Sequence, residues 1–372
     1  MTRTAEVDTI RGFALLGICV VNIPFLAQPV AALAEPTAGI DHLMRLALQM
    51  FFEGKFFVLF SFIFGWGFAI QIASAERAGV SASARFLRRL LGLLLIGIAH
   101  ATLVFFGDIL VLYALLGVPL LLLRHASPRR LLLIAGCAVT VGAVALFALA
   151  LAFGQLAASF PVSAGPGYLG SFVDGVQQRI RDWPDAFAFI LMFNGPLAFA
   201  AFCLGLAAAK VGFFEPDNSV YGALRRRVPL LLAVALPLNL IYALASSNYF
   251  GTTPVAALGF ALLAFGGPLL GALYLVGAVE LARWGQFQGA TVAAGRMSLT
   301  VYVLEGVFAG LIFNGYGLAL YGSVGALGCF GVAVAVYLAT HFFAAIWLSR
   351  FAQGPLEVIL RWITRGNAGA PT

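Results

Sequence analysis

The chain has 372 residues, of which 62% are hydrophobic and 10% are charged. A soluble domain carries about a quarter of its residues as charged ones, because charge solvates its surface. The composition therefore excludes an ordinary water-soluble protein and favours lipid as the solvent for most of the surface. The net charge of +7 does not indicate a nucleic-acid partner, because the basic residues separate apolar runs instead of forming one basic face.

Ten apolar segments match, or nearly match, the roughly 20 residues that a helix needs to cross the hydrocarbon core. They are residues 12–30, 46–73, 90–106, 109–123, 131–156, 186–209, 228–245, 255–281, 297–314 and 318–348. The fourth is short, and the tenth is long enough to tilt or to extend beyond the bilayer. The sequence therefore predicts an all-α polytopic membrane helix bundle of about ten transmembrane helices, forming a single integral membrane domain over residues 1–372.

The distribution of basic residues predicts the orientation of these helices. Of the 22 Lys and Arg residues, 18 fall on the side of the N-terminus, three fall on the opposite side, and Lys55 lies within a span. Cytoplasmic loops of membrane proteins carry the excess of Lys and Arg. We therefore expect both termini, including a tail over residues 350–372, in the cytoplasm, with the protein in the cytoplasmic membrane.

The longest loop, residues 157–185, is expected outside the cytoplasm. It begins with a turn-rich stretch that contains two prolines, Pro161 and Pro166. Its second half places apolar residues at helical spacing from Leu169 to Trp183, which predicts an amphipathic helix at the membrane surface. Such a helix either rests on the bilayer or forms a lid over a site that opens outward.

The first span carries polar residues along one face. Arg11 and Asn22 are eleven residues apart, which is three helical turns plus about 20°, so both lie on the same face. Asp8 precedes Arg11 by three residues, a spacing that allows a salt bridge. Arg11 is therefore either a membrane anchor with its acidic partner or part of a functional site.

The second span contains two charged residues, Glu53 and Lys55, among aromatic ones. On an unbroken helix they would lie 200° apart and would not pair across one face. Gly54 between them favours a local break that lines a cavity. The alternative is that both charges lie in the headgroup region at the outer end of the helix.

The third and fourth spans form a tight hairpin that contains His100, Asp108 and Tyr113. Asp108 follows His100 by eight residues, about 12 Å along a helix, so we expect it to cap the turn without touching His100. Folding the hairpin about Gly107 and Asp108 returns Tyr113 to the depth of His100. An ionisable residue at this depth is either a hydrogen-bonding structural group or a catalyst.

In the ninth span Ser298, Tyr302 and Glu305 share a face at positions i, i+4 and i+7. Glu305 lies near the middle of the membrane, where a carboxyl group needs a partner or neutralisation by a proton. Together with Glu53 and Lys55, these residues form the intramembrane polar set from which a substrate site can be built.

The order of several short motifs resembles the YeiB family of bacterial membrane proteins, from Asp8 to Thr364. These motifs are Asp8–Gly12 with Asn22, Gly54–Phe56 with Gly65, His100 with Gly107–Tyr113, Gly295–Thr300 and Gln353–Glu357. That family is similar to a broader superfamily of transmembrane acyltransferases, which includes bacterial O-acetyltransferases and the lysosomal heparan-α-glucosaminide N-acetyltransferase. The resemblance implies transfer of an acyl group from cytoplasmic acyl-CoA to a substrate across the membrane.

The O-acetyltransferase branch carries an Arg in its first helix and a His eleven positions later, where this chain has Asn22. His100 is then the remaining candidate for the general base. Glu305 also departs from the family pattern, in which an amide is usual at that position.

The leading hypothesis is therefore a membrane-embedded acyltransferase that uses acetyl-CoA or a longer acyl-CoA and needs no metal. Its acceptor is a small molecule, a lipid or a glycan with a hydroxyl or amine. Asn22 or Tyr113 would stabilise the oxyanion, with Asp108 in the same catalytic group. A basic cytoplasmic mouth would hold the CoA phosphates; its residues are Arg11, Arg85, Arg88, Arg89 and Arg296.

Two other classes of function also fit the sequence. A transporter or permease for a small amphipathic metabolite would use the same spans, the intramembrane charges and an outer lid. A partner protein without catalytic activity, bound to another membrane enzyme, is the third class. The sequence does not determine the oligomeric state, the acyl group or the acceptor.

Overall fold

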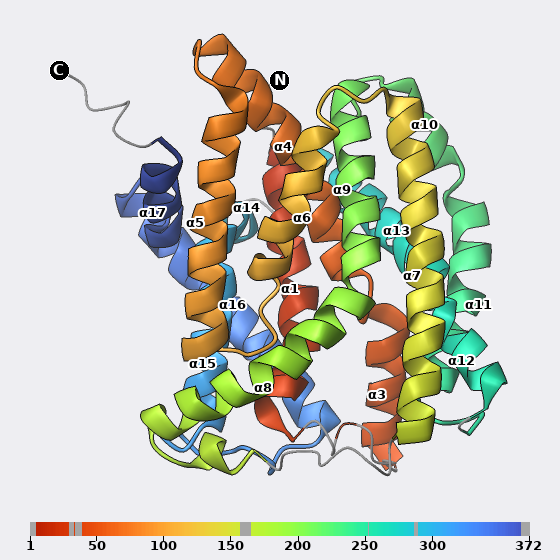
Figure 1. The fold of residues 1–372 in the computed structure, drawn as a ribbon, viewed down its shortest axis with the longest axis vertical. Helices are drawn as coiled ribbons and strands as arrows, with labels where there is room; N and C mark the ends of the chain where they lie inside the picture. The colour runs from red at the N-terminus through yellow and green to blue at the C-terminus, as the bar shows by residue number, and fades with distance from the viewer. Residues whose placement is uncertain are drawn as a thin grey trace.

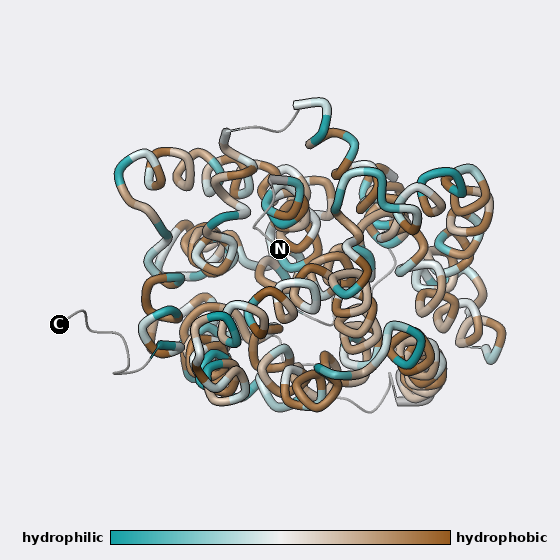
Figure 2. Tube along the Cα trace, turned by 90° about the horizontal axis from the view of Figure 1, so that it is seen from above, coloured by the Kyte–Doolittle hydropathy of each residue, from teal (hydrophilic) through white to brown (hydrophobic). Residues whose placement is uncertain are grey.

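The computed structural model describes residues 5–29, 33, 39–156, 165–251, 253–285 and 289–365. These residues form helices and turns and contain no strand, so the predicted all-α fold is confirmed. The helices stand side by side in a bundle, and most of them are seen end-on when it is viewed from above (Figure 1, Figure 2).

Each predicted span corresponds to helical structure, although not always to one straight helix. Unbroken spans are α1 (Ala5–Ala27), α5 (Ala82–Leu103), α7 (Pro128–Leu156), α11 (Val228–Ser246) and α16 (Ala326–Arg350). Two further spans join α3 (Gly39–Phe51) to α4 (Phe56–Arg77), and α12 (Pro254–Ala261) to α13 (Leu263–Arg283).

Two other spans are sharply bent pairs of helices. They join α8 (Phe172–Phe193) to α9 (Gly195–Lys210) at 51°, and α14 (Ala290–Arg296) to α15 (Ser298–Phe313) at 101°. Among the described residues, seven helices are therefore long and apolar enough to cross a membrane, or up to nine with each bent pair as one span. The predicted fourth span is α6 (Leu110–Leu122), whose 13 residues are too few to cross alone.

The start of the tenth predicted span is wrong. Residues 318–325 form turns, and α16 begins only at Ala326, because the chain folds back on itself after Asn314. In this turn region Leu318 N donates a hydrogen bond to Leu311 O, and Gly322 N donates one to Ala27 O. The apolar composition of the segment reflects this packing and not a longer helix.

The predicted break beside Gly54 is confirmed. Residues 52–55 form turns between α3 and α4, and Gly54 has a φ of +82°, a conformation that favours glycine. A Cβ atom at this position would lie 2.6 Å from Leu263 Cδ1, so a larger residue would also displace that side chain.

The amphipathic helix predicted in the long outer loop is present as α8, preceded by the short 3-10 helix η1 (Pro166–Leu169). Ser171 caps α8 in a reciprocal arrangement with Asp174. The helix runs on to Phe193, farther than the predicted loop, and forms a continuous bent unit with α9. The turn-rich start of the loop, residues 157–164, lies outside the described residues.

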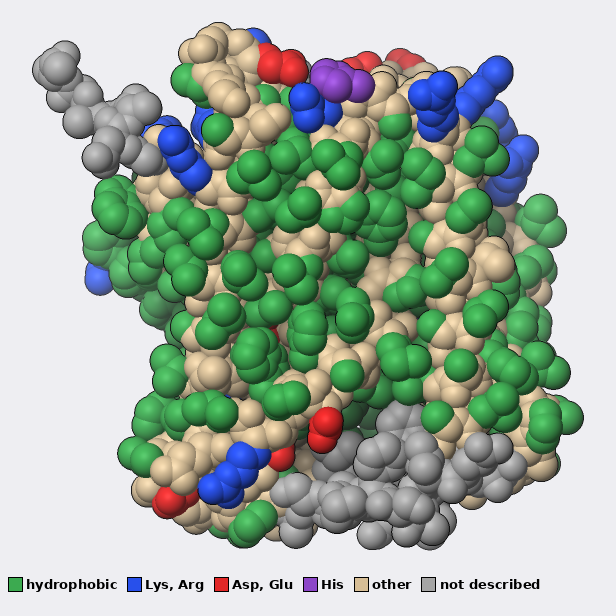
Figure 3. Space-filling model, viewed as in Figure 1, with side chains coloured by type: hydrophobic (Ala, Val, Ile, Leu, Met, Phe, Trp, Pro, Cys, Tyr) green, Lys and Arg blue, Asp and Glu red, His purple; other side chains and the backbone are tan. Residues whose placement is uncertain are grey.

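The surface of the bundle is banded. On the face shown in Figure 3, apolar side chains cover the middle, and charged side chains gather toward the upper and lower edges. The start of α1, α10 (Ser219–Arg226) and α17 (Pro355–Arg365) lie toward the upper end, called the α10 end; η1 and α8 lie toward the opposite, α8 end (Figure 1). This pattern is typical of a protein surrounded by lipid.

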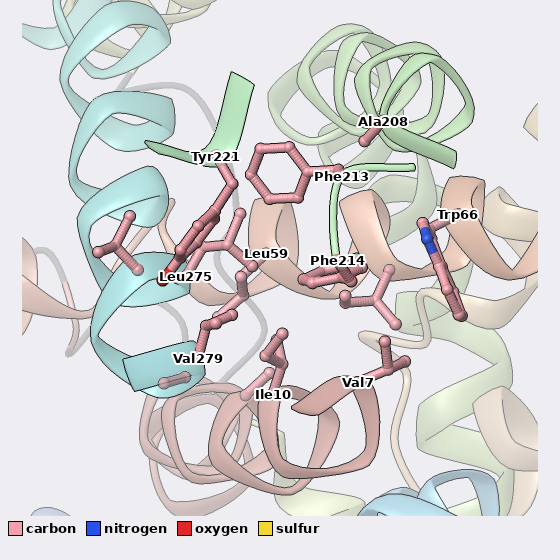
Figure 4. Packing of buried hydrophobic residues seen from close by; sticks show 14 of the residues in the cluster. Val7, Ile10, Leu59, Trp66, Ala208, Phe213, Phe214, Tyr221, Leu275 and Val279 are labelled. Atoms are coloured by element: carbon pink, nitrogen blue, oxygen red, sulfur yellow. The ribbon is translucent and has the colours of Figure 1, made fainter. Parts of the chain in front are cut away.

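Buried apolar clusters hold the helices together. In the cluster of Figure 4, side chains from α1, α4, α10, α13 and the turn after α9 point toward one another. Val7, Ile10 and Val279 are fully buried in it. This packing fixes α1 beside α4 and α13, and α1 carries part of the candidate site.

Candidate functional site

A small cavity lies inside the bundle where three helices meet. Helix α1 contributes Cys19, Asn22 and Leu26, α5 contributes His100, and α15 contributes Tyr302, Glu305 and Gly306. Its volume is about 10 Å³, which is roughly what one water molecule needs. The bundle therefore brings together four predicted site residues from three distant parts of the chain.

His100 forms a buried pair with Asp108, and the prediction that these residues do not touch is wrong. Nδ1 of His100 lies 2.8 Å from Oδ2 of Asp108, and their relative exposures are 3% and 0%. The prediction measured the eight residues from His100 to Asp108 along a helix, but α5 ends at Leu103 and the chain then turns back. Asp108 also accepts a hydrogen bond from Val111 N at 2.9 Å, so it caps α6 as predicted.

The close approach of α5 and α6 makes this pair possible. A Cβ atom at Gly97 would lie 2.8 Å from Val111 N and 2.9 Å from Asp108 Oδ1. Glycine at this position therefore leaves room for the start of α6 and for the carboxylate beside His100.

The second ring nitrogen of His100 is left without a partner. Nε2 is buried and forms no hydrogen bond with any described residue. It faces α15, where a Cβ atom at Gly306 would lie 3.0 Å from it, and the ring of Tyr302 lies 4.9 Å from the imidazole ring. With Nδ1 held by Asp108, Nε2 is the nitrogen available to a molecule in the cavity.

Glu305 is the second group in the cavity with unused hydrogen-bonding capacity. Its exposure is 4%, and neither carboxyl oxygen has a hydrogen-bond partner among the described residues. An unpaired buried carboxyl group is costly in free energy, so its presence usually indicates a function or a bound molecule. Asn22 lines the same cavity with its side-chain amide.

Tyr113 is not brought to this cavity. Its hydroxyl lies 2.6 Å from Ser61 Oγ and donates a hydrogen bond to Phe57 O at 3.1 Å, both on α4. Ser298, predicted to share a face with Tyr302 and Glu305, lies at the start of α15, two helical turns from Glu305, and does not line the cavity. Of that predicted face, Tyr302 and Glu305 line the cavity.

The predicted basic mouth divides into two groups. Arg11 forms the predicted salt bridge with Asp8 at 3.2 Å, and its charge interacts with that of Arg89. Nε of Arg89 is buried and has no hydrogen-bond partner among the described residues. The other three predicted residues do not join this pair in any interaction that the structure shows: Arg88 donates to Arg365 O, Arg296 is exposed, and Arg85 is half-buried.

The pair of Glu53 and Lys55 lies apart from the His100 cavity. Lys55 is fully buried, donates a hydrogen bond to Gln49 O at 2.7 Å and lies 5.2 Å from the ring centre of Tyr242. Lys55 is therefore enclosed by the protein and is not exposed on its surface. Because the helix is broken here, the 200° separation does not apply, and the two charges attract each other.

Comparisons with known proteins find one matching family model and several similar proteins. A family model described as "Protein of unknown function (DUF418)" matches residues 208–367. The uncharacterized protein YxaH of Bacillus subtilis is 29% identical over 97% of this chain and 94% of its own length. The uncharacterized protein YeiB of Escherichia coli is 26% identical over 99% of this chain and 98% of its own.

The chain is therefore similar to YeiB-like proteins over nearly its whole length, and to the DUF418 family over residues 208–367. An uncharacterized 39.9 kDa protein of Bacillus acidopullulyticus is also similar, with 27% identity over 97% of this chain and 94% of its own. No solved structure matches the chain. The resemblance stated from the sequence motifs is thus confirmed for the YeiB-like family.

Sequence reasoning missed the role of one residue in this YeiB-like protein. Glu357 of α17 accepts hydrogen bonds from Leu299 N at 2.8 Å, Thr300 N at 3.2 Å and Thr300 Oγ1 at 2.6 Å. It therefore caps the first turn of α15, where backbone N–H groups have no helical partner. Glu357 stands in the Gln353–Glu357 motif, which was a sequence signal without an assigned partner.

Proposed function

We propose that this YeiB-like protein is a membrane-embedded acyltransferase that moves an acyl group from cytoplasmic acyl-CoA to a hydroxyl or amine of an acceptor. One observation carries the proposal. A buried carboxylate holds one nitrogen of His100, while the other has no partner in the described ranges and faces a cavity that also contains Asn22. This is the arrangement expected of a general base oriented by an acidic residue.

The chemistry follows from these positions. His100 Nε2 takes the proton of the acceptor while its oxygen or nitrogen forms a bond to the thioester carbonyl carbon. The amide of Asn22 donates a hydrogen bond to the resulting oxyanion. The carbon–sulfur bond then breaks, His100 returns the proton to the departing sulfur, and CoA leaves as a thiol.

The position of Arg11 supports entry of the donor from the α10 end. Arg11 and Asn22 lie on one face of α1, about 16 Å apart along its axis. A CoA whose phosphates bind near Arg11 and Arg89 must extend its thioester along α1 to reach the cavity. The excess of Lys and Arg predicts that this end lies on the cytoplasmic side of the bacterial inner membrane.

A proton-coupled transporter is the second candidate function, favoured by the unpartnered carboxyl of Glu305 and by the broken spans. The two functions are separated by incubating purified protein with acetyl-CoA and longer acyl-CoAs, and measuring specific binding and thiol release. We expect saturable binding and thiol release that requires an acceptor. The absence of any CoA binding would overturn the enzyme proposal in favour of the transporter.

The orientation has its own test. Reporter fusions after Thr364 and within residues 159–168 should give signals from opposite sides of the membrane, with the first in the cytoplasm. A cytoplasmic signal from the second fusion would contradict the proposed topology.

A further inference from the structure

A second cavity adjoins the His100 cavity toward the α8 end. The two share Leu26, and the neighbouring residues Phe105 and Phe106 line the first and the second cavity respectively. The polar residues that line the second cavity come from η1, α8 and the segment after α15: Tyr168, Arg179, Asn314 and Tyr321. A molecule that extends through both cavities would therefore reach from α8 to His100.

Arg179 is the charged residue that lines this second cavity. Its exposure is only 1%, which makes it one of the largest fully buried side chains among the described residues. Nε donates a hydrogen bond to Thr102 O at 3.0 Å, and the guanidinium lies 5.9 Å from the ring centre of Phe172. Nη2 is buried and has no hydrogen-bond partner in the described ranges.

The guanidinium also lacks an acidic partner. No Asp or Glu of the described residues lies within 4.0 Å of it, whereas Asp182, one turn away, is held by Tyr168 at 2.7 Å and by Gln178 at 2.9 Å. A buried cation without an anion is strongly disfavoured, so the site is electrostatically incomplete in the absence of a ligand.

The remaining lining residues are neutral. Burial, followed by the nearby charge of Asp182, raises the pKa of Tyr168 and the pKa of Tyr321, so both phenols stay uncharged at physiological pH. Asn314 uses its amide nitrogen to donate a hydrogen bond to Tyr316 Oη at 2.9 Å. The cavity is therefore positively charged, with neutral hydrogen-bonding groups around the guanidinium.

We infer that the second cavity is the acceptor subsite, and that it takes an acceptor with an oxyanion, a phosphate or carboxylate, bound by Arg179. The inference rests on the proposed function. Guanidinium groups bind these oxyanions through strong charge-assisted hydrogen bonds. Anchored there, the acceptor directs its hydroxyl or amine toward His100 from the outer side, while acyl-CoA approaches along α1 from the α10 end.

The subsite is closed in this conformation. Its volume is about 10 Å³, roughly what one water molecule needs, so an acceptor enters only when η1 and α8 move outward. This gives the predicted lid helix a specific role, because the residue that binds the acceptor belongs to the lid itself. The oxyanion comes either from a phospholipid headgroup or from a soluble phosphorylated or carboxylated molecule.

The test measures anion binding directly, without acyl-CoA. Purified protein in uncharged detergent is titrated with phosphatidylglycerol in one arm and with glycerol 3-phosphate in the other, while thermal unfolding is followed. Diacylglycerol and glycerol are the neutral controls. We expect one anionic probe, and neither neutral control, to raise the unfolding temperature of the wild type; the arm that responds identifies the source. No response to either anion would overturn the inference.

Variants locate the binding. Arg179→Met should weaken binding of the responding probe by about tenfold or more, since a charge-assisted interaction is lost. Arg179→Lys should weaken it less, because it keeps the charge but not the planar fork. Arg181→Met is the matched control, because Arg181 is exposed two residues along the same helix, and it should bind as wild type does.

The outcomes separate this inference from the proposed function. Unchanged binding in Arg179→Met overturns the inference; if that variant does not fold, unchanged binding in Arg179→Lys does so. If the protein releases thiol but binds no anion, the subsite inference is wrong and the transferase proposal stands. If anion binding depends on Arg179 but the protein never releases CoA, the transferase proposal is wrong and the anion site stands.

Discussion

Two glutamates on or against α15 have opposite environments. Glu357 reaches the first turn of α15 from α17, and both of its carboxyl oxygens accept hydrogen bonds. Glu305 lies in the middle of α15, and neither oxygen has a partner among the described residues. The two carboxyl groups thus differ in their use: Glu357 caps the helix, while the hydrogen-bonding capacity of Glu305 is not used by any described residue.

The same contrast extends to the other polar residues of the bundle. The hydroxyl of Tyr113 forms hydrogen bonds with Ser61 Oγ and Phe57 O, and the ammonium of Lys55 donates one to Gln49 O. His100 and Arg179, in contrast, each have one buried nitrogen beside a cavity that forms no hydrogen bond within the described part of the chain. Intramembrane polarity alone does not identify a functional residue; unused hydrogen-bonding capacity beside a cavity is the more specific signal.

The largest expected effect concerns His100. His100→Ala and His100→Gln should both remain folded and lower acyl transfer by about 10²–10⁴-fold, because neither side chain can take and return a proton. Asp108→Asn should produce a loss in the same range, because an amide does not orient the imidazole as the carboxylate does. Thiol release and thermal unfolding, measured on the same preparations, separate activity from stability.

A structural histidine gives the reverse result. His100→Gln would then be active, because an amide keeps the hydrogen bond to Asp108, and His100→Ala would be unstable in detergent. An active and stable Gln variant would remove His100 from the catalytic role and leave Glu305 as the carboxyl group that lines the cavity.

The second prediction compares the two glutamates directly. Glu357→Met should lower the free energy of unfolding by about 1–2 kcal/mol, since the first turn of α15 loses its cap. Glu305→Met should raise it by about 1–3 kcal/mol, because a buried unpaired polar group is replaced by an apolar one of similar length. Denaturation of both variants in one detergent measures whether each free energy of unfolding rises or falls. A loss of stability in both variants would contradict the predicted difference between the two glutamates.

The third prediction concerns donor binding. Arg11→Ala should weaken acyl-CoA binding by about tenfold, because Arg11 lies near Arg89 and can share a phosphate with it. Arg296→Ala should have a smaller effect, because Arg296 is exposed and its charge is screened by solvent. Binding should weaken further at higher salt.

Arg181→Ala, on the α8 end, serves as the control for this measurement and should bind acyl-CoA as the wild type does. Equal affinity in the wild type, Arg11→Ala and Arg296→Ala would remove both residues from the donor site.

The smallest effect is expected for Tyr113→Phe. It removes the hydrogen bonds to α4 and should lower the free energy of unfolding by about 1 kcal/mol. Transfer should be unchanged, because Tyr113 does not line the cavity. A loss of thiol release in this variant, with binding intact, would show that the cavity extends to Tyr113 during the reaction.

The sequence by itself determined the features that depend on local physical chemistry. Hydropathy over about 20 residues predicted the helical segments, and spacing along one helix predicted the salt bridge between Asp8 and Arg11. Helical periodicity predicted α8, and Gly54 predicted the break after α3. Each of these features is decided by residues close together in the chain.

Only the tertiary structure decided which polar residues meet. The contact between His100 and Asp108 depends on where α5 ends and how the chain turns back, and a straight helix would keep them about 12 Å apart. Glu357 reaches Thr300 across 57 residues, and Arg179 is buried because α8 packs over α5. Packing between distant segments therefore determines which polar groups are satisfied, and local patterns do not encode it.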